Sequence, residues 1–336
     1  TTLATLLGLA HASRWVVDRY DAQGCFALHL EETRALALLD TLRKFLDGPA
    51  LESTRALFKA GDEEPSLVDF PRADSLRAFI TFARAQWLGE MIATGRLTAW
   101  FQPIVEVRAG HRVVAVEALA RGFSEGGRPR PVLPARLLSA ARDAGLMPSF
   151  DRFVHERAID RLAALDASDV DLFLNVTPRS LEDPRFDLEQ LVGAARDRGL
   201  DPSRITLEII EHETIERLER LQDILTQARS FGLGVALDDL GAGYSNLNLI
   251  HQLRPDVVKL DMALIRNIAT DGYKAIIAQK ILEATRRLGV RTVAEGVENP
   301  TELAWLDAHG VDMVQGFIVG RPSPSPGLGE ARSMSA

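Results

Sequence analysis

The stretch VALDDLGAGYSNL, residues 235–247, carries the strongest fold signal in this sequence. Apolar residues lead into two adjacent carboxylates, Asp238 and Asp239, and the chain then continues through Gly241 and Gly243. Successive side chains of a β-strand point to opposite faces, so two neighbouring aspartates can share one site only where a strand ends. The stretch therefore predicts a buried strand that ends at an acidic site.

Short β-rich runs alternate with helical segments over the larger part of the chain. Candidate strands are 98–107, 112–120, 171–176, 205–210, 234–238, 257–261, 291–295 and 312–317. Candidate helices are 132–145, 149–165, 216–232, 273–289 and 300–310. Such alternation over roughly 230 residues predicts an α/β protein with a (β/α)8 TIM-like barrel, with an open doubly wound sheet as the alternative.

One strand of this barrel is expected to run antiparallel to the others. Only RAGHR, residues 108–112, joins the first two candidate strands. A parallel connection needs about a dozen residues or more, so these two strands must form a hairpin.

The barrel pattern sets the expected domain boundaries. Residues 1–92 are predicted to form a small, mostly helical N-terminal region, with amphipathic helices over 31–48 and 74–92 and a role, regulatory or other, that the sequence leaves open. Residues 93–325 are predicted to form the barrel. Residues 326–336 have no hydrophobic periodicity and are expected to be a disordered tail.

Composition limits the possible partners and compartments. The chain has 336 residues, a formal net charge of −8 and one cysteine, Cys25. The acidic balance argues against binding to a nucleic-acid polymer, and a single cysteine excludes an intrachain disulfide. No apolar run reaches the roughly 18 residues of a membrane span. We therefore expect a cytoplasmic protein without membrane contact.

Polar side chains stand at the carboxyl ends of almost all candidate strands, where barrels build their active sites. They are Glu117, Asn175, Glu208, Asp238, Asp239, Lys259, Glu295 and Gln315. Any one of them alone could be an idle, solvent-exposed group. Five carboxylates at one mouth, however, would repel one another unless cations neutralised them. Oxygen ligands favour Mg²⁺ or Mn²⁺, and two such ions about 3.5–4 Å apart are the usual device for cleaving a phosphodiester.

Seven motifs occur in an order and spacing that is similar to the EAL family of cyclic di-GMP phosphodiesterases. They are VEALARG, LNVTP, LEIIE, LDDLGAGYSNL, VVKLD, VAEGVE and VQGF, within residues 116–317. The resemblance covers about residues 95–325, most of the chain. It implies a metal-dependent phosphodiesterase that opens cyclic di-GMP to linear pGpG by in-line attack of an activated water.

The resemblance also implies a role for each residue at the mouth. Glu117, Asn175, Glu208 and Asp238 resemble the ligands of one metal ion, and Asp238, Asp239 and Glu295 those of a second. Lys259 matches the lysine that orients or helps to deprotonate the attacking water. The predicted catalytic set is Lys259, Glu117, Asp238, Asp239 and Glu295.

Substrate contacts and loop positions follow from the same resemblance. Gln102, Leu119, Arg121, Gln315 and Pro322 are predicted to contact the substrate, and Glu211 and Glu298 to organise neighbouring loops. Glu117, Leu119 and Arg121 alternate along one strand, which places them on one face and Arg121 near the metal ions. For Lys259 the alternative is a plain salt bridge to Asp261 or another acid. His155, His212, His251 and His309 are interpreted as surface or packing residues.

Two ions of Mg²⁺ or Mn²⁺ are the expected cofactors, with Ca²⁺ inhibitory because it is larger and less demanding of octahedral geometry. A homodimer is the assembly that the resemblance implies. Two alternatives stay open. One is a catalytically silent module that only senses cyclic di-GMP, and the other is a barrel phosphodiesterase for a different substrate.

Overall fold

The computed structural model describes residues 16–20, 25–29, 41–46, 48–56, 74–108, 110, 112–124, 130–165, 167, 169–184, 186–210, 218–241 and 248–325. The chain divides into two compact units, residues 1–93 with 138–145 and residues 94–137 with 146–336. Glu211, His212 and the predicted tail 326–336 lie outside the described residues.

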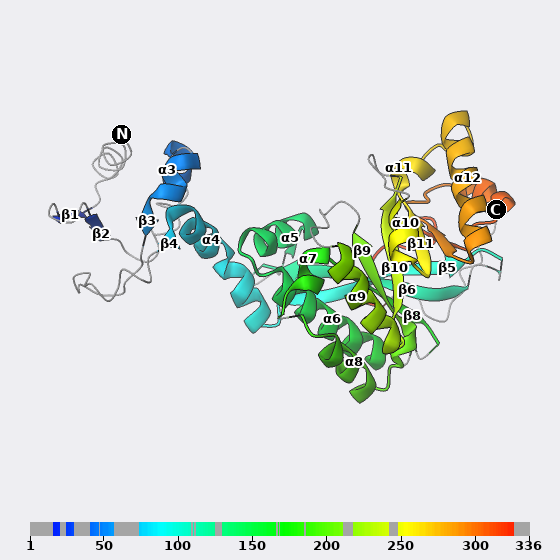
Figure 1. The fold of residues 1–336 in the computed structure, drawn as a ribbon, viewed down its shortest axis with the longest axis horizontal. Helices are drawn as coiled ribbons and strands as arrows, with labels where there is room; N and C mark the ends of the chain where they lie inside the picture. The colour runs from blue at the N-terminus through cyan, green and yellow to red at the C-terminus, as the bar shows by residue number, and fades with distance from the viewer. Residues whose placement is uncertain are drawn as a thin grey trace. The chain divides into compact units, whose positions relative to one another are not determined.

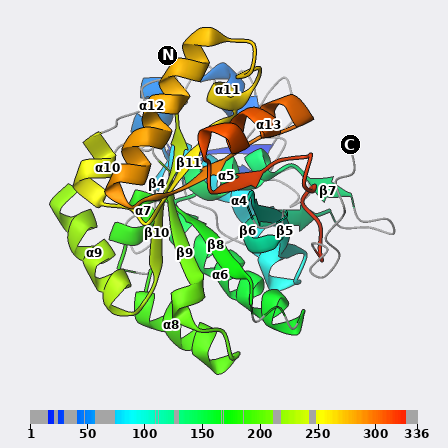
Figure 2. The ribbon, with the colours of Figure 1, turned by 90° about the vertical axis from the view of Figure 1, so that its right-hand side faces the viewer.

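The second unit is a closed barrel with helices around its strands (Figures 1 and 2). Its strands are β5 (Leu97–Glu106), β6 (Val113–Phe123), β8 (Asp171–Val176), β9 (Ile205–Ile210), β10 (Gly234–Leu240), β11 (Val257–Leu260), β12 (Arg291–Ala294) and β13 (Met313–Gln315). β5 pairs antiparallel with both β6 and β13, and the remaining neighbours are parallel. The predicted barrel with one antiparallel strand is confirmed, and the open sheet is wrong because β5 closes the ring.

The helices of this unit follow the strands in the chain. They are α6 (Met147–Ala164), α7 (Pro178–Glu182), α8 (Leu188–Asp197), α9 (Leu218–Ser230), α10 (Asn248–Leu253), α11 (Met262–Ile265), α12 (Gly272–Leu288) and α13 (Pro300–His309). Helix α5 (Pro134–Asp143) begins in this unit, and its residues from 138 onward belong to the first unit. Local chemistry sets their ends: Asp271 caps the first turn of α12, and Gly289 ends it in the left-handed conformation. A short strand, β7 (Pro131–Val132), extends the sheet beyond β6.

The sequence prediction omitted helix α8. The side chain of Asp187 accepts hydrogen bonds from the backbone amides of Glu189 and Gln190, as an N-cap does. Four residues at helical spacing are buried beneath it: Leu188, Leu191, Val192 and Ala195. The cap and the spacing are both readable from the sequence, so this omission was not forced by tertiary effects.

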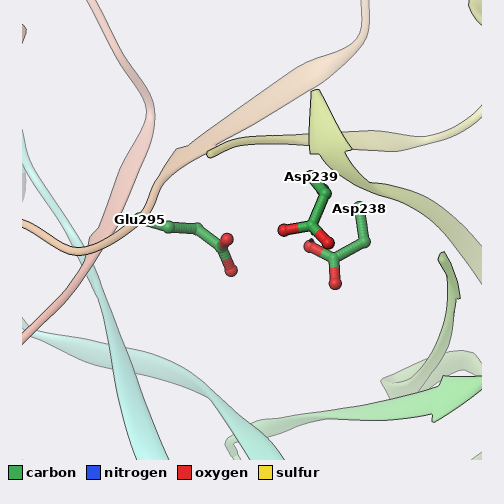
Figure 3. A group of neighbouring side chains, drawn as sticks. All are labelled: Asp238, Asp239 and Glu295. Carbon is green, nitrogen blue, oxygen red and sulfur yellow. Dashed lines mark hydrogen bonds between the residues drawn. The ribbon is translucent and has the colours of Figure 1, made fainter. Parts of the chain in front are cut away.

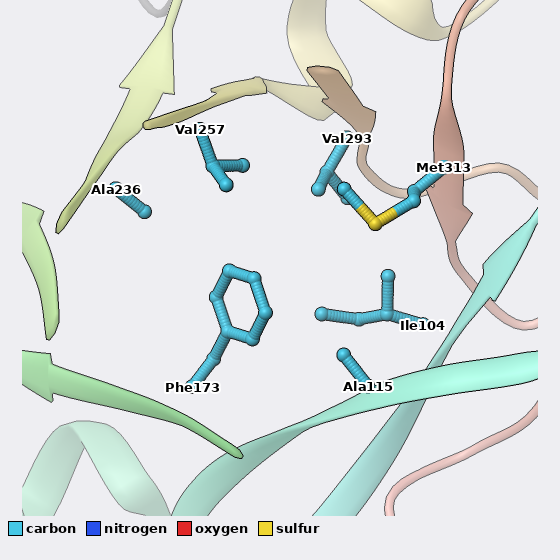
Figure 4. Close-up of a cluster of buried hydrophobic side chains, with 7 residues drawn as sticks. All are labelled: Ile104, Ala115, Phe173, Ala236, Val257, Val293 and Met313. Carbon is cyan, nitrogen blue, oxygen red and sulfur yellow. The ribbon is translucent and has the colours of Figure 1, made fainter. Parts of the chain in front are cut away.

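An apolar layer fills the barrel between the strands (Figure 4). Each of its members is at most 3% exposed, and they come from seven strands: Ile104, Ala115, Phe173, Ala236, Val257, Val293 and Met313. The Phe173 ring points toward the middle of the group, where the smaller Ala115 and Ala236 side chains leave room for it (Figure 4). Large and small side chains thus fill the barrel interior together, as close packing requires.

The described part of the N-terminal unit contains helices and short strand pairs. The predicted helix over 74–92 corresponds to α4 (Leu76–Ala93), and α3 (Gly48–Ser53) precedes it. β1 (Val16–Tyr20) pairs with β2 (Cys25–His29), and β3 (Arg55–Ala56) with β4 (Asp74–Ser75). The sequence prediction included neither strand pair, although Val16, Val17 and Tyr20 are good strand formers. Of the predicted helix over 31–48, residues 41–45 are described as helical.

Among the described residues, no helix combines the length and the hydropathy that crossing a membrane requires.

Candidate active site

The polar side chains predicted at the strand ends lie one step above the apolar layer. A step of two residues keeps a side chain on the same face of a strand and moves it roughly 6–7 Å along the barrel. This step leads from Ala115 to Glu117, from Phe173 to Asn175, from Ala236 to Asp238, from Val257 to Lys259, from Val293 to Glu295 and from Met313 to Gln315. On the antiparallel β5 the same step runs backwards, from Ile104 to Gln102. The barrel interior therefore changes from apolar to charged within one layer.

The end of β10 explains how two adjacent aspartates serve one site. Asp239 has a φ of 60°, in the left-handed region that few residues other than glycine adopt. The pairing of β10 with β11 shifts register between Leu237 and Leu240. This irregularity turns the Asp239 side chain toward the side that Asp238 already faces, and the Asp239 amide donates a hydrogen bond of 3.0 Å to Asp238 Oδ1.

Three carboxylates form a group that could hold a metal ion (Figure 3). One oxygen each from Asp238, Asp239 and Glu295 lies within 4.8 Å of the others. Glu295, in the segment after β12, points toward the two aspartates at the end of β10 (Figure 3). These are the three residues predicted for the second metal ion.

Lys259 lies among four carboxylates. Its Nζ is 2.6 Å from Glu295, 2.8 Å from Glu208, 3.3 Å from Asp238 and 3.5 Å from Glu117. The Lys259 side chain is 1% exposed and that of Glu208 is 0% exposed. Asp261 accepts a hydrogen bond from the Ala263 amide and caps α11. The ion pairs of Lys259 are formed with other acids, which the salt-bridge alternative also allowed, and they place the lysine at the centre of the acidic group.

Burial and charge shift the pKa values of this group strongly. Burial raises the pKa of Glu295 to about 8, against the lowering effect of Lys259, and burial likewise holds the pKa of Glu208 well above its ordinary value. Burial alone would lower the pKa of Lys259, but the charges of Asp238, Glu117, Glu208 and Glu295 together raise it well above its usual range. Without further cations, Glu208 and Glu295 therefore favour their neutral, protonated forms.

Two amides hold Glu117 from opposite sides. Asn175 Nδ2 donates to Glu117 Oε1 at 2.6 Å, and Gln315 Nε2 donates to Glu117 Oε2 at 2.7 Å. Burial would raise the pKa of Glu117, but Lys259 and these two donors lower it below its ordinary value. Because a carboxylate only accepts hydrogen bonds, each amide must turn its nitrogen to Glu117 and its oxygen away. The buried Gln315 Oε1 has no hydrogen-bond partner among the described residues.

The residues of this site fit divalent metal ions. Four carboxylates, those of Glu117, Glu208, Asp238 and Glu295, lie within 3.5 Å of Lys259, and that of Asp239 lies beside Asp238 and Glu295. Buried Glu208 Oε2 has no hydrogen-bond partner among the described residues, so it retains its capacity to bind a cation. Oxygen donors without cysteine or histidine suit Mg²⁺ or Mn²⁺.

The other predicted substrate and loop residues lie around this group with contacts of their own. Gln102 Nε2 donates to the Gly320 carbonyl at 3.3 Å. Arg121 Nη1 donates to the Ala120 carbonyl, and the guanidinium lies 5.6 Å from the ring centre of Trp100. Glu298 forms a 3.0 Å ion pair with Arg266. Leu119 is the β6 partner of Trp100, and Pro322 is half-buried after β13.

Two further residues support the site and were not singled out as functional from the sequence. His155 is buried, and its Nε2 lies 2.8 Å from the backbone oxygen of Asn175. Glu302 is buried and accepts hydrogen bonds from the amides of Asn267 at 3.0 Å and Glu298 at 3.1 Å. Glu302 thereby joins the loop after β11 to the segment that carries Glu295. The Asn299-to-Glu302 spacing of a capping box was the readable signal for it.

Comparisons with known proteins agree with this geometry. The family model described as the EAL domain matches residues 85–322. The cyclic di-GMP phosphodiesterase PA2567 of Pseudomonas aeruginosa is 32% identical over 230 residues, 66% of this chain and 38% of that protein. Curated relatives extend well beyond the match, since the aligned part spans 28%, 38% and 32% of three of them.

Solved structures share the fold. A manganese and cy-diGMP complex of BlrP1 from Klebsiella pneumoniae is 31% identical with a TM-score of 0.59, covering 68% of this chain and 56% of that one. A standalone EAL protein from Vibrio cholerae, in its c-di-GMP bound form, is 31% identical with a TM-score of 0.60, covering 68% and 92%.

Proposed function

Because this chain belongs to the EAL domain family, we propose that it is a two-metal phosphodiesterase that hydrolyses cyclic di-GMP to linear pGpG. The observation that supports this best is the position of Lys259 within 3.5 Å of four carboxylates at the carboxyl ends of the barrel strands. A silent sensor would not need this concentration of buried charge, which costs stability wherever cations do not balance it.

The residues divide into two ligand sets. Glu117, Asn175, Glu208 and Asp238 would hold one ion, and Asp238, Asp239 and Glu295 the other. Bound Mg²⁺ or Mn²⁺ would lower the pKa of the attacking water and stabilise negative charge on the attacking and leaving oxygens. The amide nitrogen of Asn175 is held by Glu117, which leaves its oxygen for the ion.

Lys259 acts on the attacking water. Its ammonium group donates hydrogen bonds and can hold the water in line with the phosphorus. To accept a proton, Lys259 needs a lower pKa than it has beside four carboxylates, whose charges raise it. Cations bound by the same carboxylates would cancel these charges and so lower the pKa of Lys259. One water adds across one P–O3′ bond, so the product has a free 3′-hydroxyl and a 5′-phosphate.

The proposed substrate contacts come from β5, β6, β13 and the segment after β13. Gln102, Leu119, Arg121, Gln315 and Pro322 would contact the dinucleotide, with Arg121 available to a phosphate because it is a planar multiple donor. Glu298 would hold the loop that follows Glu295 through its ion pair with Arg266.

A turnover assay on the purified chain tests the proposal. With Mg²⁺ or Mn²⁺ present, chromatography should show cyclic di-GMP converted to pGpG, whereas Ca²⁺ should give inhibition and excess chelator should stop the reaction. Full activity in chelator would end the two-metal mechanism. Binding of cyclic di-GMP without turnover in either metal would establish the sensor alternative, and competition with other cyclic and linear dinucleotides tests the choice of substrate.

Self-association is part of the proposal. The Tyr273, Ile276 and Ile277 side chains are 86%, 63% and 52% exposed on one face of α12, an apolar surface that a second copy of the chain could cover. Sedimentation velocity should show a dimer for the wild type and a monomer for Ile276→Lys.

Glu211→Ala is expected to reduce turnover and weaken metal affinity if Glu211 organises the loop after Asp239, as the sequence predicts.

A further inference from the structure

Trp100 lies at the mouth of the barrel, on the same interior face as the polar side chains at the strand ends. It precedes Gln102 by two residues on β5, and Gln102 precedes the core residue Ile104 by two, so the three side chains share the interior face. β5 runs antiparallel to its neighbours, which puts its beginning at their carboxyl ends. Trp100 is therefore one layer, roughly 6–7 Å, further toward the mouth than Gln102.

The ring of Trp100 is only loosely covered by its described neighbours. Phe123 is tilted by 48° with its centre 6.2 Å away, which is not a stacked pair. Arg121 Cζ lies over the ring at 5.6 Å from its centre, within cation–π range but farther than the about 3.5–4.0 Å of a stacked plane. Trp100 is half-buried, so part of its side chain is exposed at the entrance to the site.

We propose that Trp100 is the stacking surface for one nucleobase of the dinucleotide. The inference rests on the proposed function and adds a residue to it. A phosphorus atom at the level of Glu117 and Gln102 places the attached nucleoside toward the mouth, at the level of Trp100. Every base has a π-face, and stacking on an aromatic side chain is a general way to hold nucleotides.

Steady-state kinetics of Trp100→Ala and Trp100→Phe on cyclic di-GMP test the inference. Stacking of one base changes affinity by about 5- to 150-fold when the aromatic residue becomes alanine. We expect Trp100→Ala to raise KM within this range while kcat stays within about 3-fold, because the contact is made equally in the ground and transition states. Trp100→Phe should retain most of the affinity, and Trp305→Phe on α13 is the matched control because Trp305 stacks on His309 instead, with centres 3.8 Å apart.

Tryptophan fluorescence provides a second readout that does not depend on the alanine variant folding well. Rapid mixing with cyclic di-GMP should quench the wild type and Trp305→Phe, and the quenching should be lost in Trp100→Phe. Unchanged KM in Trp100→Ala, or quenching that persists in Trp100→Phe, would overturn the stacking role. Turnover of cyclic di-GMP by the wild-type protein would still support the proposed function in that case. A wild type that neither hydrolyses nor binds the dinucleotide would overturn both.

Discussion

Two adjacent layers of the barrel interior share the same strands and the same face but have opposite chemistry. The lower layer, from Ile104 to Met313, is apolar and at most 3% exposed. The upper layer, one step of two residues further along, contains Lys259 and the carboxylates around it. The lower layer gains stability by removing apolar surface from water, whereas the upper layer buries charge that no internal partner fully balances.

The difference shows that the upper layer contains buried charged groups at a cost in folding stability, because the proposed reaction requires them. The fold could continue its apolar packing to the mouth, and replacing buried charges with apolar residues often stabilises a protein. The upper layer instead keeps groups with shifted pKa values, such as Glu295 at about 8. Variants in the two layers should therefore have opposite consequences for activity and stability.

The largest expected effect is on turnover, from Lys259→Ala. We expect kcat to fall by about 10²–10⁴-fold with KM little changed, because the lysine acts on the water and not on the dinucleotide. The measurement is pGpG formation under saturating metal and substrate. Lys280→Ala, on the exposed face of α12, is the control and should have wild-type kinetics. Wild-type turnover in Lys259→Ala would assign the lysine a purely structural role.

Phe173→Ala tests the lower layer. Removing a fully buried phenylalanine should lower the free energy of unfolding by about 3–5 kcal/mol, because it leaves a cavity that the barrel cannot fill. Urea denaturation measures the change, with the 64% exposed Leu288→Ala as control. The protein that stays folded should retain kcat within about 10-fold, which is less than the Lys259 variant loses. A loss of activity without a loss of stability would remove the distinction between the layers.

His155 connects the upper layer to helix α6 and gives the protein an acid-sensitive stability. Burial lowers the pKa of His155 from 6.5 to about 4. The unfolded chain takes up a proton near pH 6.5 and the folded chain does not until about pH 4, so stability is present above pH 6.5 and falls between these values. The loss amounts to roughly 3 kcal/mol.

Chemical denaturation between pH 7 and pH 4 measures this decrease. His155→Leu should have a flatter stability profile over that range, and the control His309→Gln should follow the wild type. An unaltered slope in His155→Leu would show that other groups produce the acid sensitivity.

Glu208→Gln should have the smallest effect and the opposite sign on stability. Burial disfavours the charged form of Glu208, so the neutral isostere should raise the free energy of unfolding in chelator by about 0.5–2 kcal/mol. The same change removes a proposed metal ligand and should weaken metal affinity, measured by isothermal titration calorimetry. Glu219→Gln, on the first turn of α9, is the control. Lower stability of Glu208→Gln in chelator would contradict the view that this layer sacrifices stability.

Much of this architecture could be predicted from the sequence because its signals are local. Strand alternation and the short RAGHR connection predicted the barrel and its single antiparallel strand, which β5 confirms. The motifs around Glu117, Asp238 and Glu295 predicted the family, which the EAL domain match confirms. Helix α8 was also readable, from Asp187 and the buried spacing behind it, but the prediction omitted it.

Other features depend on contacts between distant segments. That Lys259 lies nearer to Glu295 and Glu208 than to Asp238 follows from closure of the barrel, and no local pattern contains it. The contact of His155 with the Asn175 backbone joins distant parts of the chain. So do the hydrogen bonds that Asn175 and Gln315 donate to Glu117.

The sequence by itself determined which residue types stand at the strand ends, because strand periodicity fixes the face of each side chain once the strands are known. Only the tertiary structure decided that Asp239 turns to the side of Asp238, through a left-handed φ of 60° and a register shift against β11. Only the tertiary structure also placed Trp100 at one mouth with the carboxylates, because closing the ring through β5 brings the start of an antiparallel strand to the ends of the parallel ones.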